Sequence, residues 1–322
     1  MSRPCLNFRW WLAALFCGAM LVGGYASMRT VDAPSGALAV PDGVKFVPGI
    51  VYSEANGEAL ALDLAYPVAA REPLPLVICV HGGGWHGGSR AGLHPVLWDL
   101  AQRGYVAATV SYRLVPKHRF PAPVEDLKCA VRFLRAAAGK YPIDPERVGA
   151  IGYSAGAHLV AMLGVTAPGD KLEGACGDLA ISSRLQAVVA MFGVFDLALG
   201  WQQSANMPRL EREYVQAVVR NFLGATPDAD PDLCRRASPF NYVTVDDAPM
   251  LLLHGTKDPL VSIEQSKRFS EALRKADVAV DFVSIDGAGH GFEGKDLVFA
   301  RDRVREFFAL RLAKPPPAVA PK

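Results

Sequence analysis

The pentapeptide Gly152-Tyr153-Ser154-Ala155-Gly156 could support nucleophilic chemistry through its central serine. It follows a strand-like run (residues 147–151) and precedes a helix-like run (157–163). At such a junction a Gly-x-Ser-x-Gly pattern forms a tight turn, the nucleophile elbow, whose strained backbone lifts the serine hydroxyl clear of the sheet. Small residues are needed on both sides because strand and helix pass within van der Waals contact. So short a pattern also occurs by chance, so the assignment of Ser154 as a nucleophile depends on whether its partner residues are present.

A glycine-rich turn upstream could stabilise negative charge near that serine. The apolar run 74–80 predicts a buried strand, and it leads directly into His81-Gly82-Gly83-Gly84-Trp85. Backbone N–H groups in such a turn can donate to a developing oxyanion, and the absence of side chains lets a substrate carbonyl come close. We therefore predict Gly83, Gly84 and Ala155 as oxyanion donors, in preference to an ordinary flexible turn.

A carboxylate follows another predicted buried strand, residues 249–255. The carboxyl ends of parallel strands meet at one edge of the sheet, so Asp258 should lie at the same edge as Ser154 and could orient a catalytic base. Asp246 and Asp247 precede this strand and are expected at the opposite edge.

A histidine completes the set. After a predicted helix (263–276) and a strand (279–285), His290 lies on a glycine-rich loop from which its imidazole could reach Asp258 and Ser154. A base and an orienting acid are what a serine hydroxyl needs to become a nucleophile. The chain order serine, acid, histidine also matches triads built on α/β sheets.

The elements around these residues predict an α/β fold. Apolar strand-like runs alternate with amphipathic helix-like runs from about residue 74, which is typical of a parallel sheet flanked by helices. The expected elements also include strands at 106–110 and 187–192, a helix at 124–138, and an antiparallel hairpin at 46–66 that turns at Asn56-Gly57.

The alternation breaks between residues 194 and 248. One helix is expected there, at 214–223, ended by Gly224. We interpret this insertion as a small lid over the carboxyl edge of the sheet. The alternative is a surface excursion remote from Ser154.

Further stretches carry a family resemblance. They are residues 111–126 (SYRLVPKHRFPAPVED), 182–193 (SSRLQAVVAMFG), Ala237-Ser238-Pro239 and Gly287-Ala288-Gly289-His290-Gly291-Phe292. With the elbow and the glycine turn, they make the chain resemble the α/β-hydrolase superfamily, and within it the esterases related to hormone-sensitive lipase. They are similar to the BD-FAE-like subgroup, which includes carbohydrate acetyl esterases, feruloyl esterases and arylformamidases. The resemblance covers roughly residues 45–312.

This resemblance implies an α/β-hydrolase fold with a mostly parallel central sheet and a small lid. It also implies a serine carboxylic-ester hydrolase without a cofactor, acting through an acyl-enzyme on short-chain acyl esters such as acetylated or feruloylated carbohydrate. An arylformamidase-like or peptidase-like amide hydrolase would use the same triad. The fold also serves as a non-catalytic binding module, and the intact triad argues against that alternative.

Residues next to the two turns are candidates for substrate binding. They are Trp85, which could stack on a sugar or aromatic ring, His86, which could line the pocket, and Tyr153. His158, on the helix after the serine, is expected to be packed or hydrogen-bonded rather than catalytic. Arg113 is expected either to pair with Asp126 or to belong to a solvated basic face.

Composition and the chain ends limit what else the protein could be. With 322 residues, 51% of them hydrophobic, the chain can bury the core of one α/β domain, and its net charge of +2 gives no reason to expect a nucleic-acid partner. Residues 1–26 combine Arg3, Arg9 and an apolar run, which predicts a cleaved signal peptide or an uncleaved membrane anchor. Either places the enzyme outside the cytoplasm, as a periplasmic, secreted or anchored protein. Residues 27–44 are expected to be a linker and 313–322 a disordered tail.

Four cysteines remain after residue 26. Cys79 and Cys129 are expected to be buried free thiols, whereas Cys176 and Cys234 fall in predicted loops where an exported protein could form a disulfide. We therefore predict a Cys176–Cys234 disulfide, with four free thiols as the alternative. No Cys-x-x-Cys or His-Glu-x-x-His spacing suggests a metal site.

Overall fold

The computed structural model describes residues 39–55 and 57–314. The predicted signal segment (1–26), most of the predicted linker (27–44) and the tail beyond Lys314 lie outside these residues. None of the helices in the described part of the chain is long and apolar enough to cross a membrane.

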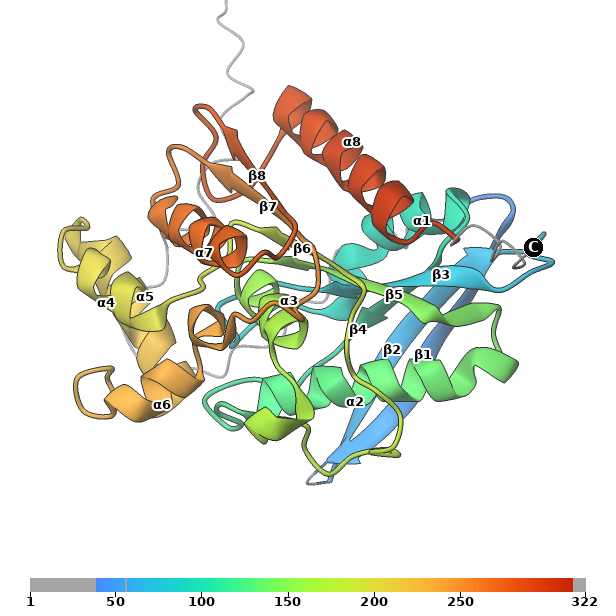
Figure 1. Ribbon diagram of the computed structural model, residues 1–322, viewed down its shortest axis with the longest axis horizontal. Helices are drawn as coiled ribbons and strands as arrows, with labels where there is room; N and C mark the ends of the chain where they lie inside the picture. The colour runs from blue at the N-terminus through green and yellow to red at the C-terminus, as the bar shows by residue number, and fades with distance from the viewer. Residues whose placement is uncertain (1–38, 56, 315–322) are drawn as a thin grey trace, which may run out of the picture. The chain divides into compact units, whose positions relative to one another are not determined.

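The central sheet has eight strands in the described residues, in the order β1-β2-β4-β3-β5-β6-β7-β8 (Figure 1). The pairs β1–β2 and β2–β4 are antiparallel, and the pairs from β4 to β8 are parallel. The strands are β1 (Val44–Ala55), β2 (Glu58–Pro67), β3 (Leu74–Val80), β4 (Val106–Val110), β5 (Ile143–Tyr153), β6 (Ala187–Met191), β7 (Met250–Gly255) and β8 (Val280–Ile285).

The strand predictions are confirmed to within a few residues. Apolar runs such as β4 and β7 are buried along their whole length, because helices cover both faces of a parallel sheet. The predicted hairpin is β1–β2. In its turn Gly57 has a φ of +77°, and Asn56 lies outside the described residues.

Helices form a layer on each face of the sheet (Figure 1). On one face lie α2 (Ala122–Ala136), α3 (Ala155–Val165) and α7 (Glu264–Lys275). On the other lie α1 (His94–Gln102) and α8 (Gly294–Arg311). The buried residues of alternate strand positions divide between these two layers, as the period of two along a strand requires. The predicted α/β-hydrolase architecture is confirmed.

The insertion between β6 and β7 contains three helices, α4 (Leu197–Ser204), α5 (Arg209–Leu223) and α6 (Pro231–Arg236). Figure 1 shows them grouped at one end of the sheet, in yellow to orange. The predicted helix corresponds to α5, which starts five residues earlier than expected (209 against 214) and ends, as predicted, at Gly224 in the left-handed conformation.

The disulfide differs from the prediction. Cys176 is joined to Cys129 of α2, with the two Cα atoms 5.5 Å apart. The predicted Cys176–Cys234 pair and the predicted free thiol at Cys129 are both wrong, since Cys234 is a buried free cysteine on α6. The loop from α3 to β6 (residues 166–186) folds back over α2, whereas Cys234 sits in the insertion. Loop composition could not indicate which element this loop covers.

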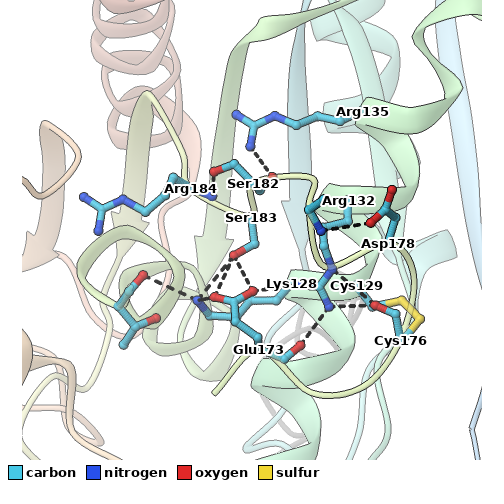
Figure 2. Close-up of polar contacts among 12 residues, drawn as sticks. Lys128, Cys129, Arg132, Arg135, Glu173, Cys176, Asp178, Ser182, Ser183 and Arg184 are labelled. Atoms are coloured by element: carbon cyan, nitrogen blue, oxygen red, sulfur yellow. Dashed lines mark hydrogen bonds and ion pairs between the residues drawn. A yellow bond between two sulfur atoms is a disulfide. The ribbon is translucent and has the colours of Figure 1, made fainter. Parts of the chain in front are cut away.

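Buried charges hold the same loop on α2 (Figure 2). The side chains of Lys128 and Arg132 are 0% and 1% exposed, and each binds the Glu173 carboxylate, at 2.6 and 2.5 Å. Ser183 also donates to this carboxylate, at 2.8 Å. Burial lowers the pKa of Lys128, and although burial would raise the pKa of Glu173, the hydrogen bond from Lys128 and the two cations hold it below its usual value. Glu173 therefore compensates two cations that water cannot reach.

We predict that Glu173→Gln lowers the free energy of unfolding by about 3–5 kcal/mol, because removing one partner of a buried ion pair leaves uncompensated charge in the core. Urea denaturation near neutral pH, with the disulfide intact, measures this loss. The control is Glu306→Gln, which breaks the exposed Arg303–Glu306 pair and should cost under about 1 kcal/mol. Equal losses in the two variants would contradict this account of the cluster.

Candidate active site

Ser154 occupies the sharp turn between β5 and α3 that the pentapeptide predicts. Its φ of +52° and ψ of −116° are strained for a residue with a Cβ, and its N–H donates to the carbonyl of Met191 at 2.9 Å. The flanking glycines have the steric role expected of them. A Cβ on Gly152 would overlap the Gly156 carbonyl, and a Cβ on Gly156 would overlap the carbonyl of Val80.

The structure brings together the three residues predicted as a triad, which are far apart in sequence. The Ser154 Oγ lies 2.9 Å from Nε2 of His290, and Nδ1 of His290 lies 2.7 Å from Oδ2 of Asp258. With the proton on Nδ1 donated to Asp258, Nε2 is free to accept the serine proton. This geometry can turn the Ser154 hydroxyl into a nucleophile.

The Asp258 side chain is fully buried, accepts three hydrogen bonds and lies close to a fourth donor. Oδ1 accepts from the N–H groups of Leu260 and Val261, each at 2.9 Å. Oδ2 accepts from His290 and lies 3.3 Å from Nε2 of His254. Burial alone would raise the pKa of Asp258, but the hydrogen bonds from His254 and His290 outweigh it and hold this pKa well below its usual value. The acid is therefore an anion at any ordinary pH.

An aromatic side chain packs against the base. The ring of Phe192 lies 5.0 Å from the His290 ring and 5.3 Å from that of Phe292, both edge-on. Phe192 has a φ of +43°, and its N–H donates to the carbonyl of Leu253 at 2.7 Å. The sequence shows only the apolar end of a strand at this position, so no pattern indicates its contact with His290.

The predicted oxyanion turn packs directly on the elbow. A Cβ on Gly82 would come within 2.7 Å of the Tyr153 carbonyl oxygen and 3.3 Å of the Ser154 Cβ, so no side chain fits between them. Gly83 and Gly84 have φ values of +110° and +58°, which glycine adopts readily. Ala155 is the first residue of α3, where an N–H has no acceptor within the helix.

His81 and Tyr112 pack together and hold this turn by hydrogen bonds. The two rings stack at 4.4 Å, and the Tyr112 hydroxyl donates to the His81 carbonyl at 3.0 Å. Nδ1 of His81 lies 2.8 Å from the Gly82 carbonyl, and burial lowers the pKa of His81. Tyr112 has no role in the sequence-based prediction, because no local pattern shows a tyrosine folding back beneath a glycine turn.

Contrary to the prediction, Trp85 does not present a ring face on which a substrate could stack. Its side chain is buried, 3% exposed, and its ring stacks on Phe222 of α5 at 4.2 Å. Its Nε1–H donates to Nδ1 of His158 at 3.3 Å, and Nε2 of His158 donates to the Ala237 carbonyl at 2.7 Å. Trp85 therefore joins the oxyanion turn to the insertion, and its faces are not available to a substrate ring. His158 is packed and hydrogen-bonded, as predicted.

Of the other two residues predicted to contact substrate, His86 is exposed and Tyr153 is half-buried. The His86 ring lies 6.3 Å from that of Tyr214 on α5, between the oxyanion turn and the insertion. Tyr153 packs with the layer that contains α1 and α8. The structure thus leaves His86 as a candidate for substrate contact and gives Tyr153 a packing role.

The remaining polar candidates are structural. Arg113 pairs with Asp126, at 2.7 Å, which is one of the two predicted alternatives. Asp247 caps the loop before β7 by accepting from the N–H and hydroxyl of Thr244, away from the elbow edge. Among residues 39–55 and 57–314, no group of three or more His, Cys, Asp or Glu side chains is arranged to hold a metal ion.

Comparison with known families agrees with this geometry. The family model BD-FAE matches residues 62–273. The chain belongs to the BD-FAE family. Among curated relatives, this BD-FAE protein is similar to Esterase LipC of Mycobacterium tuberculosis, with 34% identity over 224 residues that make up 69% of this chain and 54% of the relative. The chain thus spans about half the length of that relative.

Two solved structures are similar over most of the BD-FAE chain. A truncated carbohydrate esterase from gut microbiota has a TM-score of 0.71 and 25% identity, covering 84% of this chain and 97% of its own. Thermogutta terrifontis esterase 2, phosphonylated by sarin, has a TM-score of 0.69 and 28% identity, covering 88% and 98%. Other structures of that esterase contain propionate or butyrate. The family resemblance predicted from sequence is confirmed.

We predict that the buried imidazole of His158 makes stability fall in acid. Burial lowers the pKa of His158 to about 4, below the value of about 6.5 for an unfolded histidine. The folded state therefore binds fewer protons than the unfolded state between these values. The stabilisation is complete above about pH 6.5 and should decline by about 2–3 kcal/mol as the pH falls to about 4.

Urea denaturation of wild type and His158→Gln across this pH range measures the effect. The variant cannot titrate at this position, so its stability deficit relative to wild type should shrink as the pH falls. Stability curves that stay parallel for the two proteins would contradict the prediction.

Proposed function

We propose that this chain is a serine carboxylesterase that hydrolyses short-chain acyl esters through an acyl-enzyme. The observation that carries the proposal is the hydrogen-bonded series Ser154–His290–Asp258, with contacts of 2.9 and 2.7 Å beside a glycine turn. Membership of the BD-FAE family and the similarity to named esterases support it.

In the proposed reaction, His290 takes the Ser154 proton as Oγ attacks the ester carbonyl carbon. The N–H groups of Gly83, Gly84 and Ala155 donate to the oxyanion that forms. His290 then returns the proton to the leaving alcohol, while Asp258 stabilises the imidazolium and fixes the ring tautomer. Water activated by the same histidine releases the acid and restores the serine. No step needs a cofactor.

The substrate is proposed to be a carbohydrate ester, with either a small acyl group, as in acetylated carbohydrate, or an aromatic acyl group, as in feruloylated carbohydrate. The similarity to a carbohydrate esterase and to an esterase solved with propionate and butyrate supports this class. Amide or N-formyl aryl hydrolysis would use the same triad and is the second candidate. A purely binding role is disfavoured, because a non-catalytic module has no need of three aligned side chains.

We predict that Ser154→Ala lowers kcat/KM for p-nitrophenyl acetate by a factor of about 10⁴ or more, because the nucleophile is lost. Wild type should also react with a fluorophosphonate probe, and Ser154→Ala should not. The variant keeps the fold, which circular dichroism verifies. Near-normal hydrolysis by Ser154→Ala would show that the reaction does not use this serine.

A panel of substrates tests the proposed substrate class. We expect wild type to prefer p-nitrophenyl acetate and butyrate over octanoate, and to release acid from methyl ferulate or acetylated xylan. Octanoate preference, or inactivity on both methyl ferulate and acetylated xylan, would contradict this substrate class. Activity confined to N-formyl aryl or peptide substrates would favour the amide hydrolase instead.

We also propose that the N-terminal segment directs the hydrolase domain out of the cytoplasm, as an exported or membrane-anchored enzyme. The Cys129–Cys176 disulfide supports this proposal, because disulfides persist mainly in oxidising compartments. The full chain expressed in a bacterium should yield active enzyme from outside the cytoplasm. Intact mass separates a cleaved signal from an uncleaved anchor, and alkylation after unfolding should find Cys79 and Cys234 free. Activity confined to the cytoplasm, with all thiols free, would overturn the proposal.

A further inference from the structure

A second histidine lies behind the proposed catalytic acid. His254, near the end of β7, is fully buried and surrounded by three polar partners. Its Nε2 lies 2.9 Å from the Val261 carbonyl oxygen and 3.3 Å from Oδ2 of Asp258. Its Nδ1 lies 2.7 Å from the Ser266 hydroxyl on α7. The proposed acyl-enzyme mechanism does not use this side chain.

The partners determine where the ring carries hydrogen. Both neighbours of Nε2 are acceptors, a carbonyl oxygen and a carboxylate, so Nε2 must carry a proton. That N–H hydrogen-bonds to the Val261 carbonyl oxygen, and Oδ2 of Asp258 is its second, longer contact. The Ser266 hydroxyl can donate to Nδ1 and thereby fix this tautomer and the orientation of the ring.

We propose that His254 is a positioning residue for the catalytic acid: its Nε2–H holds Oδ2 of Asp258 toward His290 and takes up part of the carboxylate charge. This inference rests on the proposed function, in which Asp258 orients the base. Through Val261, the same N–H also fixes the loop that carries Asp258. One donor therefore influences both the position and the charge of the Asp258 carboxylate.

The effect on catalysis follows from the arrangement around Oδ2. Two titratable side chains face this carboxylate, His290 from the loop after β8 and His254 from β7, and they share one oxygen. The other oxygen is occupied by the N–H groups of Leu260 and Val261. Each donor to an anion reduces the charge available to the others. Without the His254 donor, Asp258 holds the protonated form of His290 more strongly, and the base loses its proton at higher pH.

Two substitutions separate this role from simple packing. In His254→Gln the amide nitrogen can take the place of Nε2 and still donate to Asp258. In His254→Asn the amide reaches only the position of Nδ1, so it can contact Ser266 but not Asp258. For both variants kcat/KM for p-nitrophenyl acetate is measured as a function of pH, and the midpoint of the acid limb is determined. Thermal unfolding checks that each variant is folded.

For His254→Asn we expect the midpoint of the acid limb to rise by about 0.5 to 1 pH unit and kcat/KM on the plateau to fall about tenfold. For His254→Gln we expect a midpoint close to that of wild type and most of the activity. An unchanged midpoint in His254→Asn, or equal losses in both variants without any shift, would overturn the positioning role.

If His254→Asn does not fold, Ser266→Ala provides the test. It removes the hydroxyl that fixes the ring and leaves the ring itself in place, so the midpoint should rise in the same direction by a smaller amount. A midpoint identical to that of wild type in this variant would then overturn the inference. The Ser154→Ala result is independent: an active Ser154→Ala enzyme would refute the proposed function, whereas an inactive one with an unshifted His254→Asn profile would refute only the role of His254.

Discussion

The close crossing of three backbones at Gly152 and Gly156 is the constraint on which the candidate site depends. A side chain at either position would overlap a carbonyl oxygen, either of α3 or at the end of β3. The helix that begins after Ser154 is thus held directly against the strand that leads into His81 and the glycine turn. Ser154 and the glycine turn are therefore placed by main-chain packing, which tolerates far smaller displacements than contacts between flexible side chains.

The insertion extends this constraint beyond the sheet. Phe222 of α5 stacks on Trp85, and a Cβ on Gly84 would meet Val218 of the same helix at 3.2 Å. Trp85 itself has a φ of +61°, an unfavourable conformation for a bulky residue that persists only where the surroundings enforce it. Through these contacts the insertion packs on the glycine turn and helps to hold it in its conformation.

The sequence predicts well what depends on local pattern and chain order. Apolar runs predict the buried strands, and the rule that the carboxyl ends of parallel strands share one edge predicts that Ser154, Asp258 and His290 lie together. Sequence-based prediction is wrong where a residue's role depends on which helices, strands or loops pack against each other. Trp85 stands next to the glycine turn in sequence, but α5 covers it; Cys176 lies on a loop whose partner helix no periodicity reveals. The apolar strand sequence around His254 does not indicate a role for it, because its hydrogen-bond partners come from other parts of the chain.

The carboxylates of Glu173 and Asp258 have partners of different kinds. Glu173 is paired with Lys128 and Arg132, permanent cations that balance its charge and fix a loop. Asp258 is more deeply buried, with a side chain 0% exposed against 17% for Glu173, yet two histidines and two backbone N–H groups surround it without a fixed counter-charge. A guanidinium beside Asp258 would neutralise the field that, in the proposed reaction, stabilises the His290 imidazolium. In the proposed reaction, hydrogen-bond donors around Asp258 keep it ionised while leaving most of its charge for His290, which an ion pair with a permanent cation would not do.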